Sequence, residues 1–400
     1  MQTDLFAPLT GIRVLDASRV LAGPFCGQVF GDLGAEVIKV ERPGQGDETR
    51  TWGPPFSGDL SAYYLSCNRN KRAITLDLAR KEGLELFHEL LRRCDVLLEN
   101  FKASSAEKMR LTPQKLLDIN PRLIVCSISG FGRSGPLSDL PGYDFAVQAL
   151  SGLMSITGPV EGPPCKVGVA VTDVQTGLYA TIAVLACLQA RSRSGHGYAI
   201  DMALLDCAVA AQVNLAQAFL TSGFVPPRQG NAHLQIVPYQ LFATADGWLV
   251  LAVGNDGQWQ RFCESAGRRD LAADERFATN TLRVQNRHLI VPLLEQVLKS
   301  RTTCEWQGAL EAAEVPHAPV WDYAALFAQP QAGARALRLT VADHKGRSID
   351  LLGSPFHITG TTMPDPKMPP GLGQDTEDVL IRVLGLDGKR LDELRKLNVI

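Results

Sequence analysis

The stretch LTGIRVLDASRVLAGPFCGQVFGDLGAEVIKVE, residues 9–41, decides the fold expected of this chain. It contains a short apolar run at residues 12–16, an amphipathic segment opened by glycine and proline at residues 23–33, and a second apolar run at residues 35–40. Apolar runs of five or six residues predict strands, and the segment between them has the length and pattern of a helix. The stretch therefore predicts one β-α-β unit, in which the two strands lie parallel.

The same alternation of strand and helix continues along the first half of the chain. Further strands are predicted at residues 72–78, 95–101 and 122–129, with helices at residues 81–94 and after Thr112-Pro113. A parallel sheet with helices on both faces buries the apolar faces of such a pattern. The predicted fold class is therefore α/β, with a Rossmann-like parallel sheet in a large domain.

The second half of the chain changes character. Residues 141–222 read mainly as helix with one strand at residues 198–204, and residues 242–254 predict a hairpin with Asp246-Gly247 at its turn. We predict three parts: a large domain at residues 1–224, a smaller α+β domain at residues 225–320, and a C-terminal part, residues 321–400, that returns to the large domain.

Composition describes an ordinary globular protein of 400 residues, with 45% hydrophobic and 20% charged residues. A net charge of -2 argues against nucleic acid as the main partner, although it leaves room for a local basic pocket. Nine scattered cysteines without a C-x-x-C motif predict reduced thiols. The N-terminus resembles no export signal, and the longest apolar run, residues 180–188, is too short for a membrane span. The predicted location is cytoplasmic, with no membrane partner.

Several common catalytic motifs are missing from the sequence. There is no G-x-G-x-x-G after the first strand, no Walker A sequence, and no G-x-S-x-G elbow. The seven histidines include no i, i+4 pair that could bind zinc on a helix. We therefore predict no metal site and no ordinary dinucleotide site, and we expect the chemistry to rest on carboxylates.

Asp173 is the leading candidate among these carboxylates. It lies in VAVTDVQTG, residues 169–177, just ahead of the long apolar helix predicted at residues 178–190. Its position alone favours a helix N-cap. The two roles are compatible, because the positive end of a helix dipole keeps a carboxylate ionised, and an ionised carboxylate with small neighbours is what an oxygen nucleophile requires.

The opening stretch resembles the N-terminal signature of the class III CoA-transferases, the formyl-CoA transferase and carnitine CoA-transferase family. Further matches to that family follow in order along the chain, at residues 68–72 (NRNKR), 95–101 (DVLLENF), 130–132 (GFG), 142–144 (GYD) and 369–374 (PPGLGQ). Residues 49–56 (TRTWGPPF) together with residues 236–240 (IVPYQ) resemble one branch, the succinyl-CoA:glutarate CoA-transferases. The resemblance spans essentially the whole chain.

The resemblance implies specific roles for residues of this chain. It places the nucleophile at Asp173, and it places the CoA contacts at Leu21, Ala22, Arg42, Leu76, Asp77, Leu78, Ala79, Asn100, Phe101, Lys108, Tyr143 and Asp144. A basic set suits the phosphates of CoA: Arg42, Lys71, Arg72 and Lys108. The chain departs from the family pattern at Leu21, where glutamine is frequent, and at residues 236–240, where a glycine-rich loop covers the intermediate in formyl-CoA transferase.

Each of these positions also has a plainer interpretation. Arg42 could be a solvated charge at the end of a strand, and Lys71 and Arg72 could be surface charges flanking another. Tyr143 could be a core tyrosine with a satisfied hydroxyl. Asp144 could be a second helix cap.

The resemblance implies an enzyme that moves CoA from an acyl-CoA such as succinyl-CoA to a carboxylic acid through an aspartyl anhydride and an aspartyl-CoA thioester. The branch implies C4–C6 dicarboxylates such as glutarate as acceptors. The second carboxylate would need a cation, and the sequence does not rank the candidates Arg50, Arg69, Lys71, Arg72 and Arg133. The family also implies a homodimer with interlocked chains, and CoA thioesters as substrates without a permanently bound cofactor.

Two alternatives remain open from sequence. An α-methylacyl-CoA racemase has a related fold, but that branch places a histidine before the aspartate of the G-x-D word. Tyr143 stands there in this chain, and a phenol with an ordinary pKa of about 10 is a poor base at neutral pH. The second alternative is a CoA-binding paralogue without catalysis, against which the presence of Asp173 argues.

Overall fold

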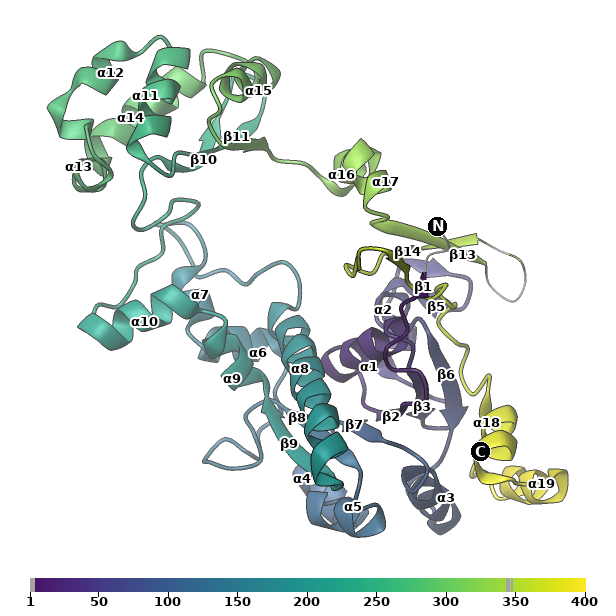
Figure 1. Ribbon diagram of the computed structural model, residues 1–400. Helices are drawn as coiled ribbons and strands as arrows, with labels where there is room; N and C mark the ends of the chain where they lie inside the picture. Colours follow the sequence, from purple (N-terminus) through teal and green to yellow (C-terminus); the bar gives the residue numbers. More distant parts are fainter. Residues whose placement is uncertain (1–3, 343–345, 347) are drawn as a thin grey trace. The chain divides into compact units, whose positions relative to one another are not determined.

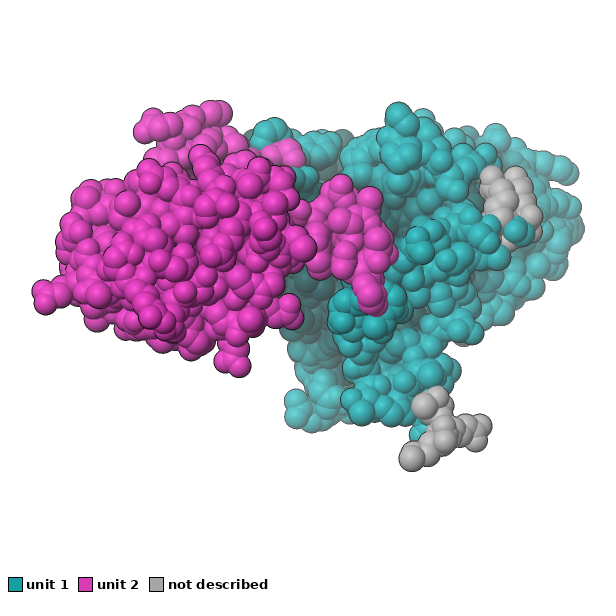
Figure 2. All heavy atoms as spheres, turned by 90° about the horizontal axis from the view of Figure 1, so that it is seen from above, with its two compact units in different colours: residues 1–153, 167–222, 331–400 teal, residues 154–166, 223–330 magenta. Residues whose placement is uncertain are grey.

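The computed structural model describes residues 4–342, 346 and 348–400. The chain divides into two compact units, which Figure 2 shows in separate colours. Unit 1 contains residues 1–153, 167–222 and 331–400, and unit 2 contains residues 154–166 and 223–330. Unit 1 thus consists of three separate stretches of the chain.

Two boundaries of these units differ from the predicted ones. Residues 154–166, expected in the large domain, belong to unit 2, and unit 2 extends to residue 330 rather than 320. Arg228 donates hydrogen bonds to the carbonyl oxygens of Pro159 (3.1 Å) and Gly162 (2.8 Å), which ties the inserted segment to unit 2. Such long-range bonds to backbone carbonyls leave no pattern in the sequence.

Unit 1 is built around a six-stranded parallel sheet with the strand order β6-β3-β2-β7-β8-β9 (Figure 1). The strands are β2 (Arg13–Ala17), β3 (Glu36–Glu41), β6 (Lys71–Thr75), β7 (Val96–Glu99), β8 (Ile124–Ser129) and β9 (Tyr198–Ala203). The direction in which strands are added reverses between β2 and β7, which is the topological switch point of a Rossmann-like sheet. The predicted α/β class with a parallel sheet is confirmed.

Alternate residues of the strands point into two separate cores. Leu15, Ile38 and Leu97 enter one core, whereas Val14 and Val37 enter the core on the opposite face, as the two-residue period of a strand requires. The first core is completed by α3 (Lys81–Leu91), α4 (Ala103–Lys108), α5 (Pro113–Ile119), α18 (Thr376–Leu384) and α19 (Gly388–Lys396). The second core is completed by α1 (Ala22–Asp32), α6 (Asp144–Leu150), α8 (Val171–Ser194) and α9 (Leu204–Ala210).

The longest of these helices, α8, has 24 residues. Ala180 and Val184 bury one of its faces in the second core, while Leu178 and Ile182 lie exposed on another. By length and composition alone α8 could cross a membrane, a property that core helices of other proteins share. Gly195 ends the helix in the left-handed conformation that favours glycine, at φ 79°.

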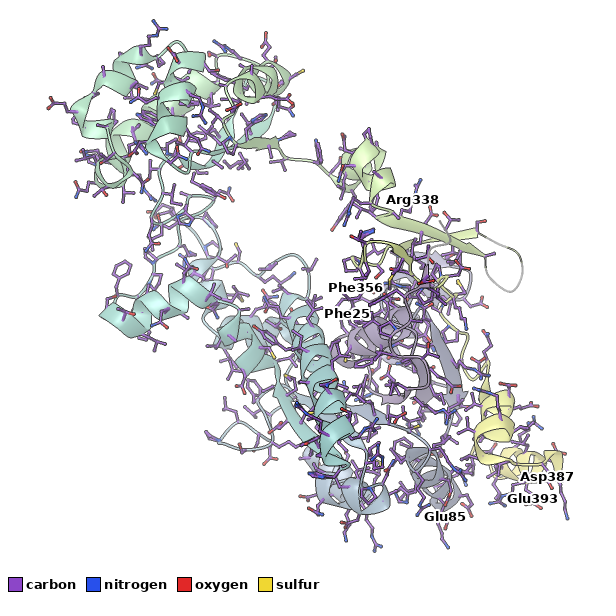
Figure 3. All side chains as sticks on the ribbon, in the orientation of Figure 1. Phe25, Glu85, Arg338, Phe356, Asp387 and Glu393 are labelled. Atoms are coloured by element: carbon purple, nitrogen blue, oxygen red, sulfur yellow. The ribbon has the colours of Figure 1, made fainter. Side chains whose placement is uncertain are left out.

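The C-terminal stretch returns to unit 1 and completes it. Its elements are α17 (Pro330–Ala334), the antiparallel pair β13 (Arg338–Ala342) and β14 (Ser348–Leu352), and β15 (Thr361–Thr362), which pairs in parallel with β1 (Asp4–Leu5). Phe356 of this stretch and Phe25 of α1 both pack against the second core (Figure 3). Asp375 accepts a hydrogen bond from the backbone N–H of Ala73 in β6 (2.9 Å). The returning stretch therefore supports the edge of the main sheet.

Shorter elements complete unit 1 and its junction with unit 2. They are η1 (Glu48–Thr51), β4 (Phe56–Ser57), β5 (Leu60–Ser61), α2 (Ala62–Ser66), α7 (Leu153–Ile156) and α10 (Val213–Ser222).

Unit 2 is a smaller α+β fold. A three-stranded antiparallel sheet contains β10 (Tyr239–Ala243), β11 (Trp248–Ala252) and β12 (His317–Pro319). The remaining elements are α11 (Asp256–Ser265), α12 (Arg269–Ala273), η2 (Glu275–Phe277), α13 (Asn280–Gln285), α14 (Arg287–Leu298), α15 (Thr303–Ala312) and α16 (Tyr323–Ala328). Trp259, Phe262 and Trp306 stack in its core. The predicted hairpin over residues 242–254 is confirmed by β10 and β11.

All nine cysteines lie among the described residues and are free thiols. Six of them are buried: Cys26, Cys67, Cys94, Cys126, Cys207 and Cys263. Burial raises the pKa of Cys26 and Cys94 to about 12, which leaves these thiols unreactive. They behave as small apolar side chains.

Candidate active site

A cavity of about 440 Å³ lies in unit 1 beyond the carboxyl ends of β2, β7 and β8. Its lining comes from the loop after β2, the loop after β7, the loop after β8 and the start of α8. These strands flank the topological switch point, where open α/β sheets bind their ligands. The volume is also within the range of small-molecule sites.

Asp173 lines this cavity as the third residue of α8. Its place results from a close approach of two helices, because a Cβ on Gly177 would lie only 2.8 Å from the carbonyl oxygen of Ala22 in α1. The start of α8 is thereby held beside the start of α1, and Leu21 and Ala22 line the same cavity. Among the described residues, the carboxylate of Asp173 accepts no hydrogen bond, so both of its oxygens are available to a ligand.

Asp144 performs the capping role that the sequence allowed for Asp173. Helix α8 begins at Val171, and Asp144 accepts hydrogen bonds from the backbone N–H (2.8 Å) and the hydroxyl (2.6 Å) of Thr172. It also accepts a longer bond from the N–H of Asp173 (3.4 Å). The N-cap interpretation of Asp173 is therefore wrong, and Asp144 is the second helix cap that the sequence left open.

This arrangement raises the pKa of Asp173 to about 7, first because the carboxyl is buried and second because the charge of Asp144 lies beside it. The expectation that the helix dipole keeps Asp173 fully ionised at neutral pH is not met. Asp144 occupies the N–H groups at the start of α8 that would otherwise stabilise the charge of Asp173. A carboxyl with a pKa near neutrality is typical of a reactive group.

Two aromatic residues stand close to this pair of carboxyls. Burial and the charges of Asp173, Cys67 and Asp144 raise the pKa of Tyr63. The ring of Trp52 packs edge-on against the ring of Tyr63, with 5.1 Å between centroids. Sequence analysis missed Tyr63, because only the fold brings α2 close to the start of α8.

The loop after β2 is held in a defined shape. Val20 has a φ of 71°, a conformation that a β-branched residue rarely adopts, and its N–H donates to both carboxylate oxygens of Asp47 (3.3 Å each). Asn100 accepts a hydrogen bond from the N–H of Arg19 (3.1 Å) and donates one to the Arg19 carbonyl (2.9 Å). Backbone strain of this kind persists only where neighbouring groups enforce it, and it is found frequently at functional sites.

The structure brings together six of the residues predicted for the site. They line the one cavity: Leu21, Ala22, Asn100, Phe101, Tyr143 and Asp173. Tyr143 is 67% exposed, so it is not the core tyrosine of the plainer interpretation.

The other predicted contacts lie outside this cavity. Arg42 is exposed in the loop after β3, and Lys108 is exposed at the end of α4. Leu76 is buried in the first core, which leaves its side chain no access to a ligand. Leu78 also packs against that core, and Asp77 donates its N–H to the carbonyl of Val399 (2.8 Å). Ala79 is exposed beside them, and Asp144 caps α8.

Two of the four basic residues expected to bind phosphate are engaged elsewhere. Lys71 is fully buried in an ion pair with Asp16 (2.8 Å), and Arg72 forms ion pairs with Asp375 and Asp378. Neither lines the cavity, and Lys71 is not the surface charge of the plainer interpretation either. The cations that do line the cavity are Arg19, Lys102 and Arg133. Sequence analysis named only Arg133 among these, and only as one candidate for a second carboxylate.

Metal chemistry finds no support in the geometry of the described residues. Among residues 4–342, 346 and 348–400, no group of three or more His, Cys, Asp or Glu side chains is placed to hold a metal ion.

The raised pKa of Asp173 predicts a pH-dependent rate. For a reaction in which this carboxylate attacks, protonation removes the attacking charge, so kcat/KM should fall about tenfold for each pH unit below 7 and level off above it. Asp144→Asn keeps an oxygen acceptor for Thr172 but removes the neighbouring charge. We therefore expect the acidic limb of this variant to move to lower pH, measured as kcat/KM against pH.

Asp118→Asn is the matched control for this measurement. Asp118 lies exposed on α5, and this helix packs on the other face of the sheet from α8. Its profile should coincide with that of the wild type. An Asp144→Asn profile that also coincides with the wild type would show that Asp144 does not set the pKa of Asp173.

Comparison with known proteins gives consistent matches across the chain. The family model described as CoA-transferase family III matches residues 9–376. The chain is 45% identical over 384 residues to a succinate–glutarate CoA-transferase of Agrobacterium fabrum, covering 93% of this chain and 95% of the relative. It is 40% identical over 393 residues to the human succinyl-CoA:glutarate CoA-transferase, covering 98% of this chain and 90% of the relative. The crystal structure of a CAIB/BAIF family protein from Brucella suis is similar at a TM-score of 0.85 and 41% identity, covering 96% of this chain and all of that one.

Proposed function

This chain belongs to CoA-transferase family III and is an enzyme of that family. We propose that it moves CoA from succinyl-CoA to glutarate or a similar C4–C6 dicarboxylate. Two relatives of 40–45% identity that cover nearly the whole chain are named for these two acids, which supports the choice of substrates. The observation that carries the proposal is the carboxylate of Asp173, unpaired in a cavity at the switch point of the sheet.

We propose that Asp173 is the nucleophile. One carboxylate oxygen attacks the thioester carbonyl, the C–S bond breaks, and an aspartyl–acyl anhydride forms as CoA leaves as a thiolate. The thiolate then attacks the aspartyl carbonyl, which forms an aspartyl-CoA thioester and releases the donor acid. The acceptor carboxylate repeats these steps in reverse, so one thioester replaces another and no co-reactant is consumed.

The surroundings of Asp173 support two requirements of this reaction, stabilisation of the developing oxyanion and a reactive carboxylate. The start of α1 lines the same cavity as Asp173, and the first N–H groups of a helix, here those of Ala22 and Gly23, have no partner within the helix. Such groups can stabilise the negative oxygen that develops on the attacked carbonyl. A pKa of about 7 makes Asp173 a stronger nucleophile than an ordinary carboxylate, while a large fraction stays ionised at neutral pH.

Exchange measured over a panel of acids tests the proposed function. The enzyme is incubated with succinyl-CoA and a series of mono- and dicarboxylates, and the new acyl-CoA is quantified. We expect glutaryl-CoA among the fastest products, and borohydride or hydroxylamine should trap a CoA adduct on the protein. Preferred transfer to monocarboxylates would contradict the dicarboxylate assignment. Uptake of α-deuterium from D₂O without an acceptor acid would instead support a racemase, and neither exchange nor adduct would support a non-catalytic CoA binder.

We further propose a homodimer of interlocked chains, located in the cytoplasm. Apolar side chains lie exposed on α8 and α10, among them Ile182 at 62% and Leu220 at 74% exposure, and exposed apolar surface of this kind favours contact with a partner. The absence of disulfides among the nine cysteines is consistent with a reducing compartment. Sedimentation on dilution tests the assembly, because interlocked chains should not yield a folded monomer.

A further inference from the structure

Arg133 follows β8 at the carboxyl edge of the main sheet. The N–H of Gly132 donates to the hydroxyl of Ser129 (2.9 Å), and the N–H of Arg133 donates to Asp201 within β9 (2.9 Å). Gly132 adopts a φ of 83°, which allows the chain to turn sharply here. The backbone of Arg133 is thereby fixed, and its side chain lines the cavity that also contains Asp173.

The guanidinium of Arg133 is mostly buried but only partly paired. Its side chain is 22% exposed, and one Nη forms an ion pair with Glu99, the last residue of β7, whose side chain is fully buried. The second oxygen of Glu99 accepts the N–H of Phe101 (2.8 Å), so Glu99 is itself held in place. The Nε of Arg133 is buried without a hydrogen-bond partner, and its second Nη has none among the described residues. Donors without a partner on a buried cation are unfavourable unless a ligand accepts hydrogen bonds from them.

The other cations considered for a second carboxylate are already satisfied. Each lies outside the cavity and forms an ion pair with a buried carboxylate or with the C-terminal stretch: Arg50 with Glu41, Arg69 with Asp32, Lys71 with Asp16, and Arg72 with Asp375 and Asp378. Arg133 is the one of the five that lines the cavity.

Two further cations line the cavity but differ in setting. Arg19 is 55% exposed and paired with Glu48, and Lys102 is exposed at the start of α4. Exposed, flexible cations suit the solvated phosphates of CoA, which lie at the far end of the molecule from its thioester. A guanidinium fixed by a buried partner suits a carboxylate that must be held in one orientation, because hydrogen bonds between charged groups are short and directional.

We propose that Arg133 binds the distal carboxylate of a dicarboxylic acyl group while the near carboxyl group of the same acid reacts at Asp173. This inference rests on the proposed transfer of CoA between dicarboxylates. Glu99 holds the guanidinium in place at the cavity wall, and the second Nη is the donor left for a ligand. Arg133 is therefore a residue that determines acid specificity rather than one that takes part in bond making.

The test uses butyryl-CoA as the donor and compares two acceptors of equal length, glutarate and valerate. Both acceptors are measured with the wild type and with the variants. Arg133→Gln alone leaves Glu99 buried and unpaired, so the informative variant combines Arg133→Gln with Glu99→Gln, which neutralises both partners and keeps their size. We expect kcat/KM for glutarate to fall about 100-fold, because a buried charge partner is lost, and kcat/KM for valerate to stay within about twofold. Arg133→Lys should recover part of the activity with glutarate.

Arg122→Gln is the matched control, because Arg122 lies exposed just before the other end of β8, where it donates to the carbonyl of Gly195 (2.8 Å). Both acids should react with this variant as with the wild type. Equal losses for glutarate and valerate, with a raised KM for butyryl-CoA, would show that Arg133 binds a phosphate of CoA and would overturn the inference. Unchanged kinetics of the double variant would overturn it while leaving the proposed function intact. A wild type that transfers CoA to no acid would overturn both.

Discussion

Asp173→Ala is expected to lower CoA exchange by at least about 10⁴-fold, because the variant lacks the oxygen that accepts the acyl group. The cavity is lined mostly by other residues, which are also the ones proposed to contact CoA, so the KM for the acyl-CoA donor should change little if any turnover can be measured. The assay follows a labelled acid appearing in the acyl-CoA pool. Exchange near the wild-type rate would rule out Asp173 as the nucleophile.

Asp173→Asn provides the control for folding. The pKa of Asp173 is raised in the folded protein, so the folded state holds its proton more tightly than the unfolded chain does. The contribution of this group to the free energy of unfolding is therefore lost as the pH rises from about 4 through 7. We expect the inactive asparagine variant to unfold at a temperature equal to the wild type at low pH and higher than the wild type at pH 8. A lower temperature at pH 8 would show that the carboxylate stabilises the fold.

Lys71→Met is expected to reduce the free energy of unfolding by about 3–5 kcal/mol, the usual consequence of removing one partner from a buried ion pair. The ammonium of Lys71 donates to Asp16 (2.8 Å), to the carbonyl of Pro24 (2.7 Å) and to Asn68 (2.9 Å), and the side chain is fully buried. Without Lys71, the fully buried Asp16 must lose its charge or draw in water. Unfolding in denaturant, followed by circular dichroism, measures the difference.

Lys81→Met is the matched control, because Lys81 is 84% exposed and pairs only loosely with Glu85 (3.7 Å). It should change the free energy of unfolding by less than about 0.5 kcal/mol. If Lys71→Met instead left stability unchanged and raised the KM for the acyl-CoA donor, the phosphate-binding role inferred from sequence would have to be restored.

The sequence was sufficient to predict most of the main sheet, because several of its strands are short apolar runs followed by a helical pattern. Val14 and Leu15 both read as apolar, and the alternation that separates them into two cores follows directly from strand geometry. The boundaries of unit 2 were harder to predict, because they depend on hydrogen bonds such as those from Arg228 to carbonyl oxygens far away in the chain.

The candidate site was only partly predictable for a similar reason. Asp173 could be named from its local sequence and the resemblance, but its pKa depends on Asp144, which is 29 residues away. Lys71 begins β6 and Arg133 lies in the loop after β8, and nothing in their local sequence distinguishes a buried cation from one that lines a cavity. Lys71 is buried in an ion pair with Asp16, whereas Arg133 lines the cavity. This difference depends on the packing of segments that are distant in the sequence.

The three-part construction of unit 1 has a consequence for synthesis on the ribosome. A nascent chain that has emerged as far as residue 330 contains every strand of the main sheet, yet it lacks the stretch that pairs with β1 and the α18 that covers β6. Unit 2 lies wholly within the emerged part and can fold first, whereas apolar residues of the main sheet stay uncovered until residues 331–400 have also emerged. The nascent chain should therefore engage chaperones until that stretch is available, and stop codons introduced between residues 331 and 376 should lead to aggregation rather than to a shortened enzyme.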